Sequence, residues 1–425
     1  MNEVLREITK RCKSYEEADF LPTIFGKFRN EAVTGTMPVV LFGAGSAGKE
    51  LCPVLKVHGV NPVCFCDNNP SRTGELYCGL PVISLSELRQ KHKDSLIVVT
   101  TGAHGDSVKQ QLVDIGFDRE RVLTISSLEA MCYYTHLAQW YWPDDDLILH
   151  ENELLNVYDL LSDQKSRDIF ASRIALLARG ADYQSFRDFI SNLSDVAYTQ
   201  GTNFQECMNP SYYDGEAYLQ FNNDLLHLDD SEVLIDGGAF TGDSTLEFIK
   251  VCSRNNLTYG KIICFEPDPR IFAELKRNTA QYNNIALKPF GLWSHTSTIR
   301  FADSNILKPG GARIVSENDN NHNLPGDTSG LTEISTTSID QCFPDEIVTL
   351  IKMDIEGAEM EALQGAISTI RRCRPKLLIS AYHKRNDLFE IPLRIHKIVP
   401  DYKLYFRHFS SNFGDTMLFA IPSND

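Results

Sequence analysis

Apolar runs of strand length alternate with stretches of helical spacing in the N-terminal part of the chain. Such runs occupy residues 38–42, 63–66, 96–101 and 122–125. Strands that alternate with helices form parallel sheets, because each helix returns the chain to the start of the next strand. We therefore predict a small Rossmann-like α/β domain over residues 35–130.

A second alternating pattern begins near residue 232 and continues to the end of the chain. Its predicted strands are 233–236, 261–266, 285–292, 298–301, 349–354 and 376–381. Two more apolar segments, 402–408 and 416–421, are separated by a polar turn and predict an antiparallel hairpin. The pattern therefore predicts a second α/β domain, residues 229–425, that ends in this hairpin.

The regions outside these two domains have other patterns. Residues 1–34 are predicted to be a helix with an irregular lead-in. Residues 131–228 are predicted to be a helical connector, because apolar residues recur there at helical spacing. An aromatic cluster in the connector comprises Tyr133, Tyr134, Trp140, Tyr141 and Trp142. Residues 302–335 are polar and rich in Gly, Asn and Asp, which indicates a functional lid or a disordered loop.

Composition narrows the class of protein. The chain has 425 residues, too many for one ordinary core, and its net charge of −16 disfavours binding to nucleic acid or an anionic membrane. Its 11 cysteines show no CxxC spacing, so we expect reduced thiols and predict no metal site. No signal peptide or membrane-spanning run is visible, which predicts a cytoplasmic protein without membrane insertion. Homo-oligomerisation is left open.

The turn after the strand at 233–236 begins with an acid instead of a glycine. Dinucleotide sites place glycine first, because a carboxylate would repel the pyrophosphate. S-adenosylmethionine has an amino group and a sulfonium but no phosphate, so it fits an acid-led turn better. The residues expected to contact this donor are Asp236, Gly238, Ala239, Phe240, Gly242, Asp243 and Ser244. For Ser244 the alternative is a capping box with Glu247, and Asp243 could also cap the helix.

The next strand ends in Glu266, which is followed by Pro267 and Asp268. A carboxylate at this position can accept hydrogen bonds from both ribose hydroxyls of a nucleoside. Glu266 and Pro267 are therefore added to the predicted donor site. Asp268 is interpreted as the N-cap of the following helix.

Two acids and a histidine mark the predicted reaction centre. Asp354 and Glu356 alternate at a strand end and point to the same side, where they could contact the donor, orient an acceptor hydroxyl or take its proton. His383 follows the next strand and is suited to proton removal near neutral pH. Glu359 begins a helix, where the helix dipole favours an acid. His408, after a later strand, is a weaker candidate of the same kind.

These segments in this order resemble the FkbM family of methyltransferases. The resemblance rests on the segments 233–245, 265–268, 351–359 and 375–383, in which the Lys-x-Asp-x-Glu-Gly-x-Glu block is the most specific. It implies a class I methyltransferase sheet, S-adenosylmethionine as the donor, and O-methylation of a sugar, glycan or related natural-product hydroxyl. The family often has an acid where this chain has Ser380, which weakens any role for such an acid in orienting the histidine.

The N-terminal domain offers an alternative site. Gly43, Gly45 and Gly48 match the dinucleotide fingerprint, and Asp67 lies where a ribose-binding acid is expected. The domain resembles small Rossmann-like domains attached to sugar-modifying enzymes. The alternative function is thus an NAD-dependent or nucleotide-sugar-binding, sugar-modifying protein, and a purely structural role for this domain is also open. A third hypothesis, a non-catalytic module, is disfavoured by the acids of the C-terminal half.

Overall fold

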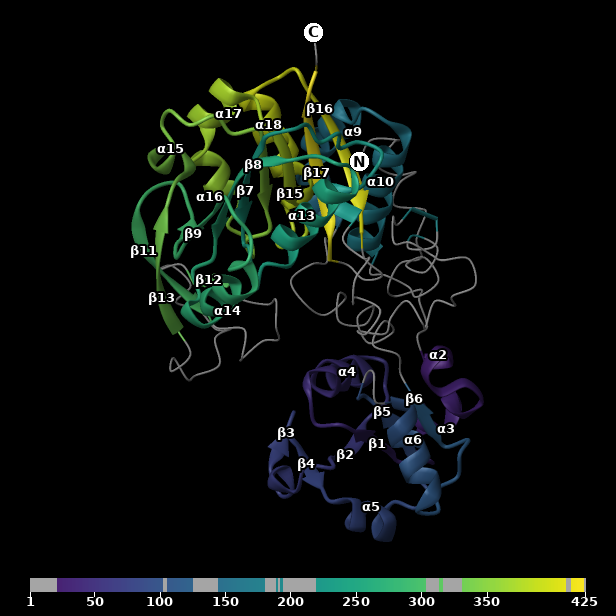
Figure 1. Cartoon of the computed structure of the whole chain (residues 1–425). Helices are drawn as coiled ribbons and strands as arrows, with labels where there is room; N and C mark the ends of the chain where they lie inside the picture. The colour runs from purple at the N-terminus through teal and green to yellow at the C-terminus, as the bar shows by residue number, and fades with distance from the viewer. Residues whose placement is uncertain are drawn as a thin grey trace. The chain divides into compact units, whose positions relative to one another are not determined.

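The computed structural model describes residues 21–101, 105–124, 144–179, 189, 192–193, 219–302, 313–315, 331–409 and 414–423 (Figure 1). The chain divides into two compact units, each of which is described separately. Unit 1 comprises Met1–Glu151, Ala171–Asn192 and Ala197–Gly215, and unit 2 comprises Asn152–Phe170, Leu193–Val196 and Glu216–Asp425. The segment predicted as a connector is therefore shared between the units. Its aromatic cluster lies outside the described residues.

Unit 1 contains a six-stranded sheet in the order β3-β4-β2-β1-β5-β6. The strands are β1 (Val39–Phe42), β2 (Pro62–Cys66), β3 (Leu76–Tyr77), β4 (Leu80–Ile83), β5 (Leu96–Val99) and β6 (Val122–Thr124). Only the β3–β4 pair is antiparallel. The central strands β1 and β5 are buried throughout, since the sheet has a hydrophobic cluster on each face. The order around β1 is that of a doubly wound nucleotide-binding half.

Short helices accompany this sheet. They are α4 (Ser46–Val57), α5 (Leu85–Lys91) and α6 (Gly105–Asp114), with α8 (Asp144–Leu149) further along the chain. The predicted capping box at the start of α5 is formed, because Ser84 and Glu87 bond to each other's backbone N–H groups. The predicted lead-in contains α2 (Leu21–Phe25), a turn of 3-10 helix and α3 (Arg29–Thr34). Residues 1–20 lie outside the described part.

Unit 2 contains a seven-stranded sheet in the order β16-β17-β15-β14-β7-β8-β9. The strands are β7 (Glu232–Gly237), β8 (Tyr259–Phe265), β9 (Ile285–Lys288), β14 (Leu350–Met353), β15 (Lys376–Ser380), β16 (Tyr402–His408) and β17 (Thr416–Pro422). β17 pairs antiparallel with both β15 and β16, and the other pairs are parallel. The carboxyl ends of β7, β8, β14 and β15 consequently meet at one edge of the sheet.

Helices connect these strands. They are α13 (Asp243–Arg254), α14 (Pro269–Thr279), α15 (Ile339–Cys342), α16 (Glu359–Gln364), α17 (Ile367–Cys373) and α18 (Asp387–Ile398). Figure 1 shows α13, α16 and α18 beside the sheet. The amphipathic helix α13 buries Phe248, Val251 and Cys252 in a cluster with Leu234 of β7 and Ile262 of β8. This packing fixes the turn between β7 and α13.

A second, four-stranded sheet in unit 2 differs from the sequence prediction. It has the order β10-β13-β11-β12, with β10 (Gly291–Leu292), β11 (Ser297–Ala302), β12 (Arg313–Val315) and β13 (Leu331–Thr337). The predicted strand 285–292 is therefore interrupted between β9 and β10. Residues 331–335 belong to β13 instead of a lid or disordered loop, because Thr332, Ile334 and their β-branched neighbours favour a strand that pairs with β11. The rest of the predicted loop, 303–312 and 316–330, lies outside the described residues.

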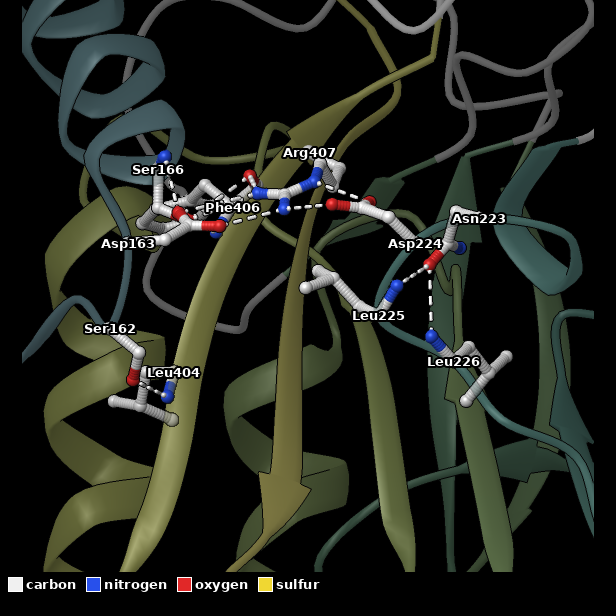
Figure 2. A network of polar contacts seen from close by, with 10 residues as sticks. All are labelled: Ser162, Asp163, Ser166, Asn223, Asp224, Leu225, Leu226, Leu404, Phe406 and Arg407. Carbon is white, nitrogen blue, oxygen red and sulfur yellow. Dashed lines mark hydrogen bonds and ion pairs between the residues drawn. The ribbon is translucent and has the colours of Figure 1, made fainter.

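Arg407 of the outer strand β16 forms ion pairs with two segments that are distant in sequence, and Figure 2 shows this network. Its side chain is 1% exposed and bonds Asp163 at 2.8 Å and Asp224 at 2.9 Å. Ser166, in the first turn of α10 (Gln164–Arg179), accepts a hydrogen bond from the backbone N–H of Phe406 at 2.9 Å. The loop between α9 (Glu151–Leu160) and α10 thus covers part of the edge of the sheet, where free backbone groups would otherwise face solvent.

Within the described part of the chain, no helix combines the length and the hydropathy that crossing a membrane requires.

Candidate active site

The turn after β7 brings the chain against the end of β14. The backbone N–H groups of Gly238 and Ala239 donate to the Phe265 carbonyl at 3.1 and 3.0 Å. Gly238 has a φ of +71°, and a Cβ added to it would lie 1.9 Å from the Asp354 carbonyl oxygen. Only glycine allows this approach. The turn therefore places the predicted donor loop directly beside the predicted reaction centre.

Asp236 is completely buried below this turn, with 0% exposed. Its carboxylate accepts hydrogen bonds from the hydroxyls of Ser244 at 2.7 Å and Thr245 at 2.6 Å, and it forms an ion pair with Lys352 at 3.1 Å. These partners surround the carboxylate on the protein side. Asp236 thus positions the turn, and its direct contact with a donor stays a prediction.

Ser244 differs from its predicted role as a helix cap. α13 begins at Asp243, and its N-cap Gly242 has a φ of +96° and no side chain to cap the helix. The predicted capping box of Ser244 with Glu247 is therefore not formed, because the Ser244 hydroxyl is turned toward Asp236. Asp243 is half-buried in the first turn of α13, where the helix dipole favours an acid.

Lys352 is a buried residue of the site for which sequence reasoning assigned no role. Its amino group donates to the Gly238 carbonyl at 3.0 Å and pairs with Asp236. Burial opposes its charge, but the carboxylates of Asp236, Asp354 and Asp243 together outweigh burial and raise the pKa of Lys352 above its usual value. The sequence could have indicated this role, because Lys352 stands between Ile351 and Met353 in an apolar strand. A lysine buried in such a strand needs a partner of opposite charge.

Glu266 lies at the end of β8, beside the same turn. It accepts hydrogen bonds from the backbone N–H of Phe240 at 3.2 Å and of Asp268 at 2.8 Å. Burial raises the pKa of Glu266 to about 7, against the opposing effect of these bonds. Pro267 follows it and is half-buried. Asp268 is the N-cap of α14, as predicted, and accepts from the N–H groups of Arg270 and Ile271.

Phe240, at the tip of the turn, has a backbone φ of +46° and a side chain that is 42% exposed. It offers a flat apolar surface to a ligand held by the turn.

The two predicted acids and the predicted histidine come together at the ends of β14 and β15. His383 Nε2 lies 3.4 Å from Asp354 Oδ1 and 3.7 Å from Glu356 Oε2. Tyr382 donates its hydroxyl to Asp354 Oδ1 at 3.0 Å. Glu356 has a φ of +55°, a backbone conformation that is strained for a residue with a side chain. The structure thus confirms that Asp354, Glu356 and His383 are neighbours.

The electrostatic environment shifts the pKa values of these three groups in different directions. Burial favours the neutral form of Asp354, but His383 and Lys352 outweigh it and lower its pKa. Burial raises the pKa of Glu356 to about 8, despite the opposing effect of His383. Burial would lower the pKa of His383, yet Glu359 and the other acids raise it to about 10. The site therefore has an excess of acidic groups around one imidazole.

Glu359 has a larger role than its predicted helix-dipole effect. It is completely buried, accepts the backbone N–H of Ile355 at 2.9 Å, and bonds His383 Nδ1 at 2.9 Å. An ionised carboxylate can only accept, so Nδ1 is the donor and the orientation of the ring is fixed. Glu359 thus orients the ring of His383.

His408 does not belong to this site. It is completely buried and bonds Thr416 through Nδ1 at 2.9 Å, between β16 and β17. Its position at a strand end gave the expectation, but the side chain packs inside the sheet layer.

The residues of the predicted N-terminal site lie in unit 1. The Ala44 N–H donates to Asp67 Oδ2 at 2.8 Å, so the acid supports the glycine turn itself. A Cβ on Gly48 would lie 2.3 Å from the Gly43 carbonyl oxygen, which explains the third glycine of the fingerprint by close packing of α4 on β1. No atom lies within 4 Å of a Cβ placed on Gly45, so that position faces open space.

Comparisons with known proteins agree with the fold. Residues 236–407 match the model of the methyltransferase FkbM domain. A 2-O-methyltransferase, NoeI, from Sinorhizobium fredii (strain NBRC 101917 / NGR234) is 24% identical over 203 residues, which cover 44% of this chain and 78% of that protein. The crystal structure of methyltransferase FkbM from Methylobacillus flagellatus KT is similar in fold, with a TM-score of 0.56, 21% identity, and coverage of 99% of this chain and 94% of that chain. The predicted α/β methyltransferase fold is confirmed.

Proposed function

Residues 236–407 match the model of the methyltransferase FkbM domain, and from this premise we propose that the protein transfers a methyl group from S-adenosylmethionine to a hydroxyl of a sugar or glycan. The observation that supports this proposal most is the joint position of two strand ends. The turn after β7 with Glu266 offers a donor site, and Asp354, Glu356 and His383 stand beside it. Donor and acceptor would meet where these two groups adjoin.

The residues of the turn fit this donor. Gly238 lets the turn pack directly against the Asp354 backbone, and Glu266 can accept the two ribose hydroxyls. Asp243, half-buried at the start of α13, is the acid that we assign to the amino group in place of Asp236. Phe240 would pack against an apolar face of the donor. S-adenosylmethionine supplies the electrophilic methyl, and the protein supplies position and a proton acceptor.

The acceptor is proposed to be a neutral hydroxyl compound. The relative from Sinorhizobium is a 2-O-methyltransferase, which supports oxygen as the atom that is methylated. The carboxylate of Asp354, whose pKa is lowered, accepts hydrogen bonds from hydroxyl groups, but it repels phosphate or carboxylate groups. In the transfer, the acceptor oxygen forms a bond to the methyl carbon while the methyl–sulfur bond breaks and its electron pair stays on sulfur. The proton of the acceptor hydroxyl passes to the carboxylate of Asp354.

We expect the replacement of Asp354 by Asn, or of His383 by Asn, to lower kcat about a hundredfold while donor affinity changes less than threefold, because these groups orient the acceptor and assist proton removal. Radiolabelled methyl transfer to a panel of neutral sugars measures kcat, and calorimetry measures donor binding. Glu346→Gln, an exposed acid paired with Lys261, is the control and should be unaffected. A larger loss in donor affinity than in kcat would remove both residues from the reaction.

The pKa of Glu266 makes donor binding depend on pH. Since that pKa is about 7, the carboxylate is largely protonated at pH 6 and ionised at pH 8. An ionised carboxylate accepts hydrogen bonds from hydroxyls more strongly, so the Kd of S-adenosylmethionine should fall about three- to tenfold as the pH rises from 6 to 8. Calorimetry across this range checks the sign. Glu266→Gln should bind weakly at both pH values, and an unchanged pH dependence in that variant would assign the titration to another group.

A further inference from the structure

The side chains at the ends of β14 and β15 have the arrangement of a cation site. Oxygen or nitrogen atoms of Asp354, Glu359 and His383 lie within 4.8 Å of one another. Glu356 adds a carboxylate oxygen 3.7 Å from His383 Nε2, and Asp354 an oxygen 3.4 Å from the same nitrogen. Around a divalent cation with bonds of about 2.1 Å, neighbouring ligand atoms are roughly 3–3.5 Å apart. The side chains are therefore close to such spacing.

The bond from Glu359 to His383 Nδ1 decides which atoms face a cation. Histidines that bind metals nearly always donate the other ring N–H to a carboxylate or carbonyl. Here Glu359 is that carboxylate, and Nε2 is the ring nitrogen that faces Asp354 and Glu356. Glu359 Oε1 is already engaged by Nδ1 and by the Ile355 N–H, so it belongs to the outer layer. Its second oxygen is buried and has no hydrogen-bond partner in the described part of the chain.

The charges of the cluster support the same conclusion. Four carboxyl groups, Asp354, Glu356, Glu359 and Asp387, surround the single imidazole of His383. The neighbouring cation Lys352 is already paired with Asp236. Asp387 is buried and interacts electrostatically with Glu359. The sulfonium and amino groups of the donor, offset by its own carboxylate, supply only one net positive charge.

We propose that Asp354, Glu356 and Nε2 of His383 bind a divalent cation such as Mn²⁺, with Glu359 holding the ring from behind. This differs from the sequence analysis, which assigned no metal. One imidazole with two carboxylates suits Mn²⁺ or a similar ion better than Ca²⁺, which takes oxygen ligands. The inference rests on the proposed function, because an open position on the cation would hold the acceptor oxygen and weaken its O–H bond. The proton then leaves to a cluster carboxylate while the O–C bond forms and the methyl–sulfur bond breaks.

The test measures cation binding separately from donor binding and from methyl transfer. Mn²⁺ is titrated into the chelator-treated full chain and followed by electron paramagnetic resonance. We expect one bound Mn²⁺ per chain, at least tenfold weaker binding in Asp354→Asn and in His383→Gln, and a smaller loss in Glu359→Gln. The exposed-acid variant Glu346→Gln should bind as the unaltered protein does, and circular dichroism confirms that all variants are folded.

The outcomes separate the two proposals. Methyl transfer that falls at least tenfold in chelator and returns with Mn²⁺ supports the cation site. Absent Mn²⁺ binding, or binding that is equal in all variants, overturns it, as does full methyl transfer in chelator. If S-adenosylmethionine fails to bind by calorimetry with or without Mn²⁺, the proposed function is overturned instead, while the Mn²⁺ titration still decides whether the cation site exists.

Discussion

Replacing Lys352 by methionine should lower the free energy of unfolding by about 3–5 kcal/mol, because it leaves the Asp236 carboxylate buried without its cation. Lys352 is 3% exposed and Asp236 is 0% exposed, so water cannot replace the lost partner. Methionine fills a similar volume, which limits the cost of lost packing. Urea denaturation followed by circular dichroism measures the change.

A double variant separates the effect of the unpaired charge from the effect of lost packing. Combining Lys352→Met with Asp236→Asn removes both charges, so we expect a large part of the stability to return. The matched control is Lys261→Met, which breaks an exposed ion pair with Glu346 and should cost less than about 1 kcal/mol. If Lys352→Met were as mild as Lys261→Met, the buried pair would not hold the turn in place.

The same variant should weaken donor binding. Lys352 bonds the carbonyl of Gly238, and Asp236 bonds the hydroxyls of Ser244 and Thr245 in the first turn of α13. The pair thus connects the end of β14 to both sides of the donor turn. We therefore expect Asp236 to affect donor binding by holding the turn in place, without contacting the donor.

The positions of the site residues at the carboxyl ends of the strands were predictable, because they depend on a local sequence pattern. In a parallel sheet, the ends of neighbouring strands meet at one edge. The positions of Asp354, Glu356 and His383 after apolar strands were therefore sufficient to predict that these residues come together. The Rossmann-like α/β class of unit 1 followed from the same alternation of strands and helices.

The partners of these residues were not predictable from local patterns. The bond from Glu359 to His383 depends on the orientation of a helix relative to the next strand, and the bond from Lys352 to Asp236 depends on strand register. An acid at a helix start is also explained by the helix dipole alone. The sheet of β10 to β13 was missed for a related reason, since β13 lies at the end of a long polar segment and pairs with distant strands.

Replacing Gly238 by alanine should disrupt the donor site more than any other single methyl group added to the turn. The new Cβ would lie 1.9 Å from the Asp354 carbonyl oxygen and 2.9 Å from its carbon, which are backbone atoms at the end of β14. A backbone contact of this kind is relieved only when the turn and the strand end move apart. The φ of +71° adds about 1 kcal/mol for a residue with a Cβ.

We therefore expect Gly238→Ala to lower the free energy of unfolding by about 3 kcal/mol and to weaken binding of S-adenosylmethionine at least about thirtyfold. Calorimetry and urea denaturation measure the two effects. Gly291→Ala is the matched control in the same unit, because its nearest atom is the Ile334 Cδ1 at 3.4 Å and its φ is not positive. It should change stability by less than about 1 kcal/mol and leave donor binding intact. Normal donor affinity in Gly238→Ala would show that the donor does not lie in this turn, since the clash displaces the backbone that the site is built on.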